Sequence, residues 1–211
     1  MKPKLNAVII GAGGVTSYML PALRNSFDLH ATIVDGDVLE KNNLDRQLFR
    51  NNMVGQHKCV ALMKQYNVII CAVDNHPARK AAIDAAKMLN TNIVVCANEY
   101  HTSQAFYYDP HLANQLDLPM LDPLVRYPEI ATDTSGSPIS CQGIALESEP
   151  QLAIANQVAA SFGNYLVWLW FGMKRPDYSD MKYMPIEFQS TFSKMQTITI
   201  NDIKQLSKKA S

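Results

Sequence analysis

The stretch Val8–Phe27, VIIGAGGVTSYMLPALRNSF, lies close to the start of the chain. Its apolar run ends in Gly11-Ala12-Gly13-Gly14 and is followed by residues with helical spacing. This order is typical of a buried strand, a phosphate-binding loop and a helix, because loop N–H groups and the positive end of a helix dipole bind anions. The stretch therefore predicts an α/β fold with a nucleotide site at its first turn.

The same alternation of strand and helix continues through the first half of the chain. Continuous apolar runs predict strands that are covered on both faces. We expect strands at 5–11, 30–35, 67–73 and 92–97, and helices at 14–26, 53–65 and 75–89, with Pro21 kinking the first helix or shaping its packing. This pattern predicts a Rossmann-like, doubly wound, mainly parallel sheet.

The second half has a different character. Residues 108–140 contain several prolines with Gly and Ser, which predicts a loop-rich segment. Residues 150–172 are apolar nearly all round and predict a buried helix, and residues 186–200 predict two antiparallel strands. Asn201 or Asp202 is expected to cap a short final helix. We expect a single domain over 1–211, with a nucleotide-binding half at 1–105 and a loop, helix and strands at 106–211.

The composition restricts the classes of partner and location. Lys plus Arg and Asp plus Glu number 19 each, which argues against a nucleic-acid or membrane-surface partner. The longest apolar stretch, Tyr165–Gly172, is too short to span a bilayer, and Met1–Asn6 is too short and polar for a signal peptide. The four cysteines include no C-x-x-C pair, which disfavours a zinc site or disulfides and favours the cytoplasm.

The glycine loop alone does not identify its ligand. Gly11 and Gly13 match the dinucleotide fingerprint G-x-G-x-x-G, but Thr16 stands at the place of its third glycine. Asp35 ends the second predicted strand, where a carboxylate binds ribose hydroxyls. NAD, FAD and ATP all fit these residues, and the structural alternative is a glycine turn that binds nothing.

The next polar residues favour a triphosphate. VDGDVLEKNNLDRQLFR and NNMVGQHK place Asn43, Arg46, Gln47 and Lys58 after the ribose carboxylate. Cations of this kind neutralise the charge that develops when a triphosphate is attacked at its α-phosphorus and pyrophosphate leaves. Asp74 follows the apolar run VIICAV at a carboxyl end of the sheet, where a carboxylate can hold the Mg²⁺ that accompanies ATP.

The motifs GAGG, VDGD, NLDRQ, VGQHK and AVDN stand in the order found in ThiF/MoeB/HesA proteins, the bacterial relatives of ubiquitin-activating enzymes. The sequence resembles this family over residues 7 to about 105, and more loosely to about 172. Within the family, YPEI, SCQGIALESEPQLAIAN and LVWLWF resemble the ThiF-type proteins of plasmid PRTRC systems.

The resemblance implies a ThiF-type adenylation domain, an ATP-dependent adenylyltransferase that works as a homodimer. Such an enzyme uses ATP and Mg²⁺ to adenylate the C-terminal carboxylate of a small ubiquitin-like (β-grasp) carrier protein. The implied roles are phosphate binding by Gly11, Gly13 and Gly14, ribose binding by Asp35, triphosphate contact by Asn43, Arg46 and Lys58 with Gln47 nearby, and Mg²⁺ binding by Asp74. Asp37 belongs to the same candidate set.

Several of these residues also have a structural interpretation. Asp37 would cap the following turn, and Arg46 would form a surface salt bridge. Lys58 would be a solvated helix charge, and Asp74 would be the N-cap of the helix at 75–89.

Three features depart from the family pattern. Relatives carry an arginine before the first strand that reaches the partner's ATP across a dimer, whereas MKPKLNA offers only Lys2 or Lys4, poor substitutes. About 15 residues separate Lys58 from Asp74, where relatives insert another strand and helix. This predicts a trimmed sheet or a segment missing from the sequence. The zinc-binding cysteines of many relatives are absent from the sequence.

Cys141 is the candidate nucleophile. Relatives that pass on the acyl group use a cysteine in a crossover loop, and Cys141 follows TDTSGSPIS and precedes the apolar helix. The alternative is a small buried residue. Cys59, Cys71 and Cys96 lie in helix or strand patterns and are expected in the core, whereas His57 and His101 are expected at the surface or in loops. The helix at 150–172 is expected in the core or at a dimer contact.

Three functions remain from the sequence. The first is adenylation of a carrier protein or peptide, with or without transfer to a thiol. The second is a Rossmann protein or oxidoreductase that binds NAD or FAD, against which the Arg46 and Lys58 pair argues. The third is a degenerate family member that binds nucleotide or partner without turnover.

Overall fold

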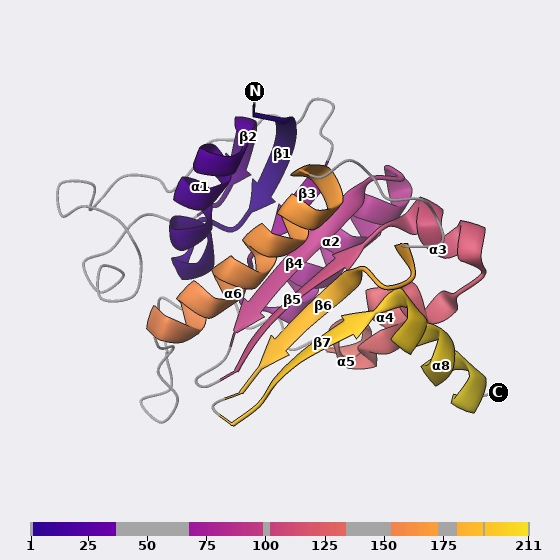
Figure 1. Ribbon diagram of the computed structural model, residues 1–211. Helices are drawn as coiled ribbons and strands as arrows, with labels where there is room; N and C mark the ends of the chain where they lie inside the picture. The colour runs from indigo at the N-terminus through magenta and orange to yellow at the C-terminus, as the bar shows by residue number, and fades with distance from the viewer. Residues whose placement is uncertain are drawn as a thin grey trace, which may run out of the picture.

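The structure is a computed structural model that describes residues 2–36, 68–98, 102–133, 153–172, 181–191 and 193–210. In these ranges seven strands form one sheet, in the order β2-β1-β3-β4-β5-β6-β7, with helices on both faces (Figure 1). The predicted doubly wound α/β fold is therefore confirmed.

The sheet has a parallel half and an antiparallel half. The strands β2 (Asp28–Val34), β1 (Lys4–Ile10), β3 (Val68–Cys71) and β4 (Asn92–Asn98) pair in parallel. The strands β5 (Ser103–Tyr108), β6 (Pro185–Ser190) and β7 (Met195–Thr199) continue the sheet from β4 in antiparallel pairing. The two strands predicted within 186–200 are thus confirmed, whereas β5 was missed.

Helices α1 (Gly14–Ser26) and α6 (Ala153–Val167) lie side by side on one face of the sheet (Figure 1). A Cβ on Gly163 would lie 3.0 Å from the Met19 Cε, and the Trp168 ring meets the Phe27 ring edge-on at 6.0 Å. Because both contacts advance in the same chain direction, the two helices run parallel and both begin at the carboxyl edge of the parallel strands. α6 continues as a π-helical turn, η4 (Trp168–Gly172).

The other face of the sheet is covered by helix α2 (His76–Met88) with α4 (Pro123–Arg126) and α5 (Pro128–Thr132) (Figure 1). α3 (Pro110–Leu116) and the 3₁₀ turn η3 (Pro119–Leu121) connect β5 to α4, and α8 (Ile200–Ala210) lies against β7 and η3. None of the helices in the described ranges is long and apolar enough to cross a membrane.

The loop predicted at 108–140 is wrong over much of its length, because the segment forms four short helical turns that each begin with a proline. Asp109 accepts a hydrogen bond from the Leu112 N–H at 3.0 Å, and Asp122 accepts one from the Leu124 N–H at 2.9 Å. Proline is well tolerated at the first helical position, where its missing N–H would have no partner. The prolines therefore start helices here.

Two further predictions are corrected. The helix predicted at 150–172 is not buried all round, since Ile154, Tyr165 and Trp168 are 56%, 52% and 39% exposed. The N-cap of α8 is Thr199 rather than Asn201 or Asp202. Asp202 instead completes a capping box, accepting from the Thr199 N–H at 2.8 Å while the Thr199 hydroxyl accepts from the Asp202 N–H at 3.3 Å. The helix predicted at 53–65 lies outside the described residues.

Candidate nucleotide-binding site

The turn after β1 requires a glycine at position 11. Its φ is +91°, and a Cβ there would lie 2.6 Å from the carbonyl oxygen of Ala72. The Gly11 N–H donates to the Val34 carbonyl at 2.8 Å, so the turn lies between the ends of β2 and β3. A Cβ on Gly13 would meet no described atom within 4 Å, which gives a ligand access to the backbone at this position.

Asp35 holds the glycine loop against the end of β2. Its Oδ2 accepts a hydrogen bond from the Ala12 N–H at 2.6 Å. The carboxylate therefore lies beside the glycine loop, and its predicted contact with a ribose stays a prediction.

Thr16 also holds the loop, from the first turn of α1. Its side chain is 2% exposed, and its hydroxyl donates to the Gly11 carbonyl at 2.5 Å. The residue that departs from the dinucleotide fingerprint therefore fixes the glycine turn through its own hydroxyl. The sequence analysis noted the departure but did not assign Thr16 a role.

Asp74 follows β3 at the same edge of the sheet and is exposed. The alternative that it caps α2 is wrong, because the N-cap is Asn75, whose side chain accepts from the Ala78 N–H at 2.8 Å. The Asn75 amide also donates to Asp74 Oδ1 at 3.2 Å. An exposed carboxylate beside the glycine turn, the candidate phosphate site, fits Mg²⁺, which in nucleotide sites takes one or two carboxylates together with phosphate oxygens and water.

A buried arginine, missed by the sequence analysis, lies behind this turn. Arg79 is 9% exposed and donates from Nη2 to the Val73 carbonyl at 3.2 Å. Its spacing was the available signal, because residues 79, 82, 83 and 86 share one face of α2 and the last three are buried core residues.

Helices α1 and α6 both begin at the carboxyl edge of the parallel strands, so the positive ends of their dipoles point toward the candidate site. Neither α1 nor α6 has an acidic residue in its first turn. At the end of β4, Asn98 Nδ2 is buried with no hydrogen-bond partner in the described part of the chain. Asn98 pairs in register with Ser103, whose hydroxyl donates to the Ala155 carbonyl of α6 at 2.9 Å. The edge therefore offers an anion several donors from the backbone and from side chains.

Comparison with known proteins finds a family resemblance in the first part of the chain. A model of the ThiF family matches residues 3–64, which include the glycine loop and Asp35. Over these residues the chain is similar to ThiF-family proteins. The Nedd8-activating enzyme E1 catalytic subunit of Drosophila melanogaster is 32% identical over 141 residues, which cover 64% of this chain and 29% of the fly protein.

Solved structures share the fold of this chain at low identity. E. coli MccB with AMPCPP and MccA has a TM-score of 0.62 at 16% identity, over 93% of this chain and 64% of MccB. MccB with ATP gives the same values, and PaaA has a TM-score of 0.59 at 14% identity, over 92% of this chain and 73% of PaaA. The chain thus spans under a third of the fly protein and 64% of MccB.

Several predicted site residues of the chain lie outside the described residues. These are Asp37, Asn43, Arg46, Gln47, Lys58 and Cys141, together with Cys59, His57 and His101. Their roles stay predictions. The described Lys2 lies at the opposite edge of the sheet from the glycine loop, where its Nζ donates to the Arg24 carbonyl at 2.9 Å.

The predicted core positions of Cys71 and Cys96 are confirmed, since both thiols are free and fully buried. Burial raises the pKa of Cys71 to about 11 and raises the pKa of Cys96 further. Neither thiol is therefore suited to nucleophilic attack at neutral pH.

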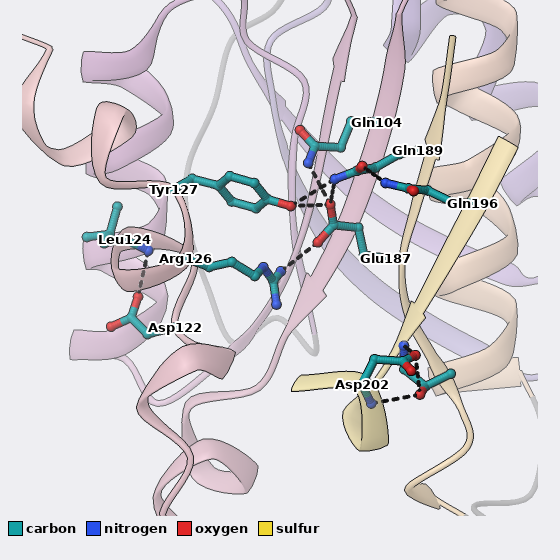
Figure 2. Close-up of polar contacts among 10 residues, drawn as sticks. Gln104, Asp122, Leu124, Arg126, Tyr127, Glu187, Gln189, Gln196 and Asp202 are labelled. Atoms are coloured by element: carbon teal, nitrogen blue, oxygen red, sulfur yellow. Dashed lines mark hydrogen bonds and ion pairs between the residues drawn. The ribbon is translucent and has the colours of Figure 1, made fainter. Parts of the chain in front are cut away.

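A second polar cluster, also missed by the sequence analysis, lies between α4 and the antiparallel strands (Figure 2). Glu187 is 0% exposed, and its Oε2 lies 2.9 Å from Arg126 Nη2. Glu187 Oε1 accepts from Gln104 at 2.6 Å and from Tyr127 and Gln189 (Figure 2). Burial and then the Glu187 charge raise the pKa of Tyr127, which keeps the phenol protonated as a donor.

This cluster fixes the segment that returns to the candidate site. α4 and α5 follow each other directly, and the described chain after α5 ends at Asp133. Asp133 Oδ2 lies 3.0 Å from Nδ1 of His76, the first residue of α2. The buried ion pair at β6 therefore anchors a segment that leads to the turn carrying Asp74.

Proposed function

We propose that the chain binds ATP with Mg²⁺ at the carboxyl edge of β1–β3 and adenylates the C-terminal carboxylate of a small ubiquitin-like (β-grasp) protein or peptide. The observation that carries the proposal is the cradle at this edge. Asp35 and Thr16 fix the glycine turn from both sides, and Asp74 projects into solvent from the neighbouring strand. The match of residues 3–64 to the ThiF family model supports the same interpretation.

The residues divide the work of binding the nucleotide. The loop at Gly11, Gly13 and Gly14 and the start of α1 bind phosphate oxygens, and Asp35 binds the ribose. Asp74 would hold Mg²⁺, which would neutralise phosphate charge. Asn43, Arg46, Gln47 and Lys58 would contact the triphosphate, and Asp37 would lie beside them.

The proposed reaction is a displacement at the α-phosphorus. An oxygen of the substrate carboxylate forms a bond to this phosphorus, and the bond to the bridging oxygen of the β-phosphate breaks. Pyrophosphate leaves with the electron pair, and the product is an acyl-adenylate. Arg46 and Lys58 would stabilise the charge that spreads over the phosphates in the transition state.

The class of substrate is supported by the relatives. The fly protein is named for activation of Nedd8, and the structural neighbour MccB is solved with ATP and with MccA. We propose that the chain acts in the cytoplasm as a homodimer, in the ThiF-type subfamily of PRTRC systems.

Cys141 would receive the acyl group in a second step. Its thiolate would attack the acyl carbonyl, and AMP would leave as the thioester forms. With enzyme, ATP and carrier, a non-reducing gel should show a thiol-sensitive adduct that Cys141→Ala loses while adenylation continues. An adduct that persists in Cys141→Ala would assign the step to another cysteine. Proven adenylation with no adduct in the wild type would mean that the adenylate itself is handed on.

Calorimetric titration tests the nucleotide. The wild type should bind ATP with Mg²⁺ more tightly than NAD, because only a triphosphate uses Arg46, Lys58 and Asp74 together. Tighter binding of NAD would favour the dinucleotide alternative and overturn the proposal.

Exchange of pyrophosphate into ATP tests the chemistry. Asp74→Ala should abolish carrier-dependent exchange while the fold stays intact, because the N-cap role belongs to Asn75. A folded Asp74→Ala variant with normal exchange would place the metal elsewhere, and ATP binding without exchange in the wild type would indicate a degenerate family member.

A further inference from the structure

Arg79 connects helix α2 to the turn that closes the candidate site. Its Nη2 donates to the carbonyl of Val73, the residue directly before Asp74, at 3.2 Å. Val73 also reaches the glycine loop, since a Cβ on Gly11 would lie 3.3 Å from Val73 Cγ1 and 2.6 Å from the Ala72 oxygen. One guanidinium thus supports the strand end that lies against the glycine turn and carries the proposed Mg²⁺ ligand.

Burying the charged Arg79 side chain in the core costs free energy. Arg79 shares its helix face with Ala82, Ile83 and Ala86, which are 2%, 0% and 0% exposed. Arginine is rarely buried to this extent, because its charge must leave water. A cation retained at such a position needs a compensating role. Its charge acts at the end of β3, where it lowers the pKa of the Cys71 thiol against the larger effect of burial.

We infer that Arg79 is a positioning residue for the nucleotide site, which fixes the Val73 carbonyl and with it the direction of the Asp74 carboxylate. The Asp74 carboxylate is exposed and accepts a hydrogen bond from its neighbour Asn75, so the backbone turn that carries both residues sets where the carboxylate lies. The guanidinium also supplies a fixed positive charge behind the turn, on the side away from solvent. This inference rests on the proposed binding of ATP with Mg²⁺.

Three variants separate the hydrogen bond from the charge and from general stability. Arg79→Met removes both the donor and the charge but keeps an apolar stem. Arg79→Lys keeps the charge and loses the planar fork. Lys80→Met is the matched control, because Lys80 lies on the same helix with a side chain that is 42% exposed and pairs with Asp84.

Two readouts are needed. Calorimetry with AMPCPP at a series of Mg²⁺ concentrations measures nucleotide affinity and the Mg²⁺ requirement. Amide hydrogen exchange without nucleotide measures the order of the turn at 72–75. We expect Arg79→Met to weaken AMPCPP binding about tenfold or more, to raise the Mg²⁺ requirement and to speed exchange in the turn. Arg79→Lys should fall between Arg79→Met and the wild type, and Lys80→Met should match the wild type.

The outcomes distinguish this inference from the proposed function. If the wild type binds AMPCPP and Arg79→Met binds it equally well at the same Mg²⁺ requirement, the positioning role is wrong and the proposed function stands. If the wild type binds no AMPCPP, the proposed function fails, and the nucleotide site that Arg79 is inferred to serve fails with it. If Arg79→Met does not fold, Arg79→Lys decides, and wild-type affinity with wild-type exchange in that variant overturns the inference.

Discussion

Breaking the Arg126–Glu187 pair is expected to destabilise the protein more than any change at an exposed ion pair. Glu187 is 0% exposed and the Arg126 side chain is 6% exposed, so each charge depends on the other for compensation. Glu187→Gln keeps the shape of the side chain and an acceptor for Tyr127 but leaves the Arg126 guanidinium buried without a counter-charge. Removing one partner of such a pair costs about 3–5 kcal/mol.

The size of this loss makes it easy to measure. For a chain of this length about 1 kcal/mol lowers the melting temperature by roughly 2–4 °C, so Glu187→Gln should lower it by about 6–20 °C. Urea unfolding gives the free energy directly, and a constant slope would show that stability rather than compactness has changed.

The double variant identifies the cause. Arg126→Met with Glu187→Gln removes both charges together and should cost only about 1 kcal/mol, because an uncharged pair needs no compensation. Lys80→Met, which breaks an exposed pair with Asp84, should cost less than about 0.5 kcal/mol. A loss below about 1 kcal/mol for Glu187→Gln, or a double variant that costs the sum of both single changes, would refute the reasoning.

Three further predictions concern the turns and the core. Gly11→Ala should lower the free energy of unfolding in urea by more than about 2 kcal/mol, because Gly11 has a positive φ and lies against the Ala72 carbonyl oxygen. Gly13→Ala should lower it by less than about 1 kcal/mol and yet weaken ATP binding. Equal losses of stability in the two variants would contradict this. Asn75→Ala should lower the free energy of unfolding by about 1 kcal/mol while Asp74→Ala leaves it unchanged, and the reverse order would return the cap to Asp74. The protonated Cys71 thiol contributes stability below pH 9 that is lost as the pH rises toward its folded pKa of about 11. Between pH 9 and 11 the unfolding free energy of Cys71→Ala should therefore fall by about 2 kcal/mol less than that of the wild type. An equal fall in both proteins would reject the buried thiol as its source.

Much of the fold could be predicted because its elements carry strong local patterns. The parallel strands β1, β3 and β4 contain continuous apolar runs, and α1 was predicted with the bounds that the structure shows, including Pro21 in its interior. β5 was missed because its sequence, SQAFYY, begins with two polar residues and lies directly before a proline-rich segment. The prolines at 110, 119, 123 and 128 were taken for loop residues, although each starts a helical turn. A proline fixes where a helix can begin, and the sequence alone does not say whether one follows.

The candidate site shows a similar division. Residues expected to meet a ligand directly, such as Gly11, Asp35 and Asp74, stand at strand ends and could be found from their order along the chain. The residues that hold them in place were missed because their partners are backbone groups, although the spacing of Arg79 on the buried face of α2 was a signal. Thr16 donates to the Gly11 carbonyl and Arg79 to the Val73 carbonyl, and no side-chain pattern in the sequence marks either acceptor.

This division explains why a departure from a motif need not weaken a site. The third glycine of the dinucleotide fingerprint allows close approach of helix and strand. At that position the chain has Thr16, which is 2% exposed and bonded to the loop that it would otherwise crowd. Its hydroxyl makes a hydrogen bond to the loop where a glycine would only allow close approach. The glycine turn is thus held by Thr16 on one side and by Asp35 on the other. A loop held in this way loses less conformational entropy when it binds a phosphate, and the tightening of the loop is therefore compatible with nucleotide binding.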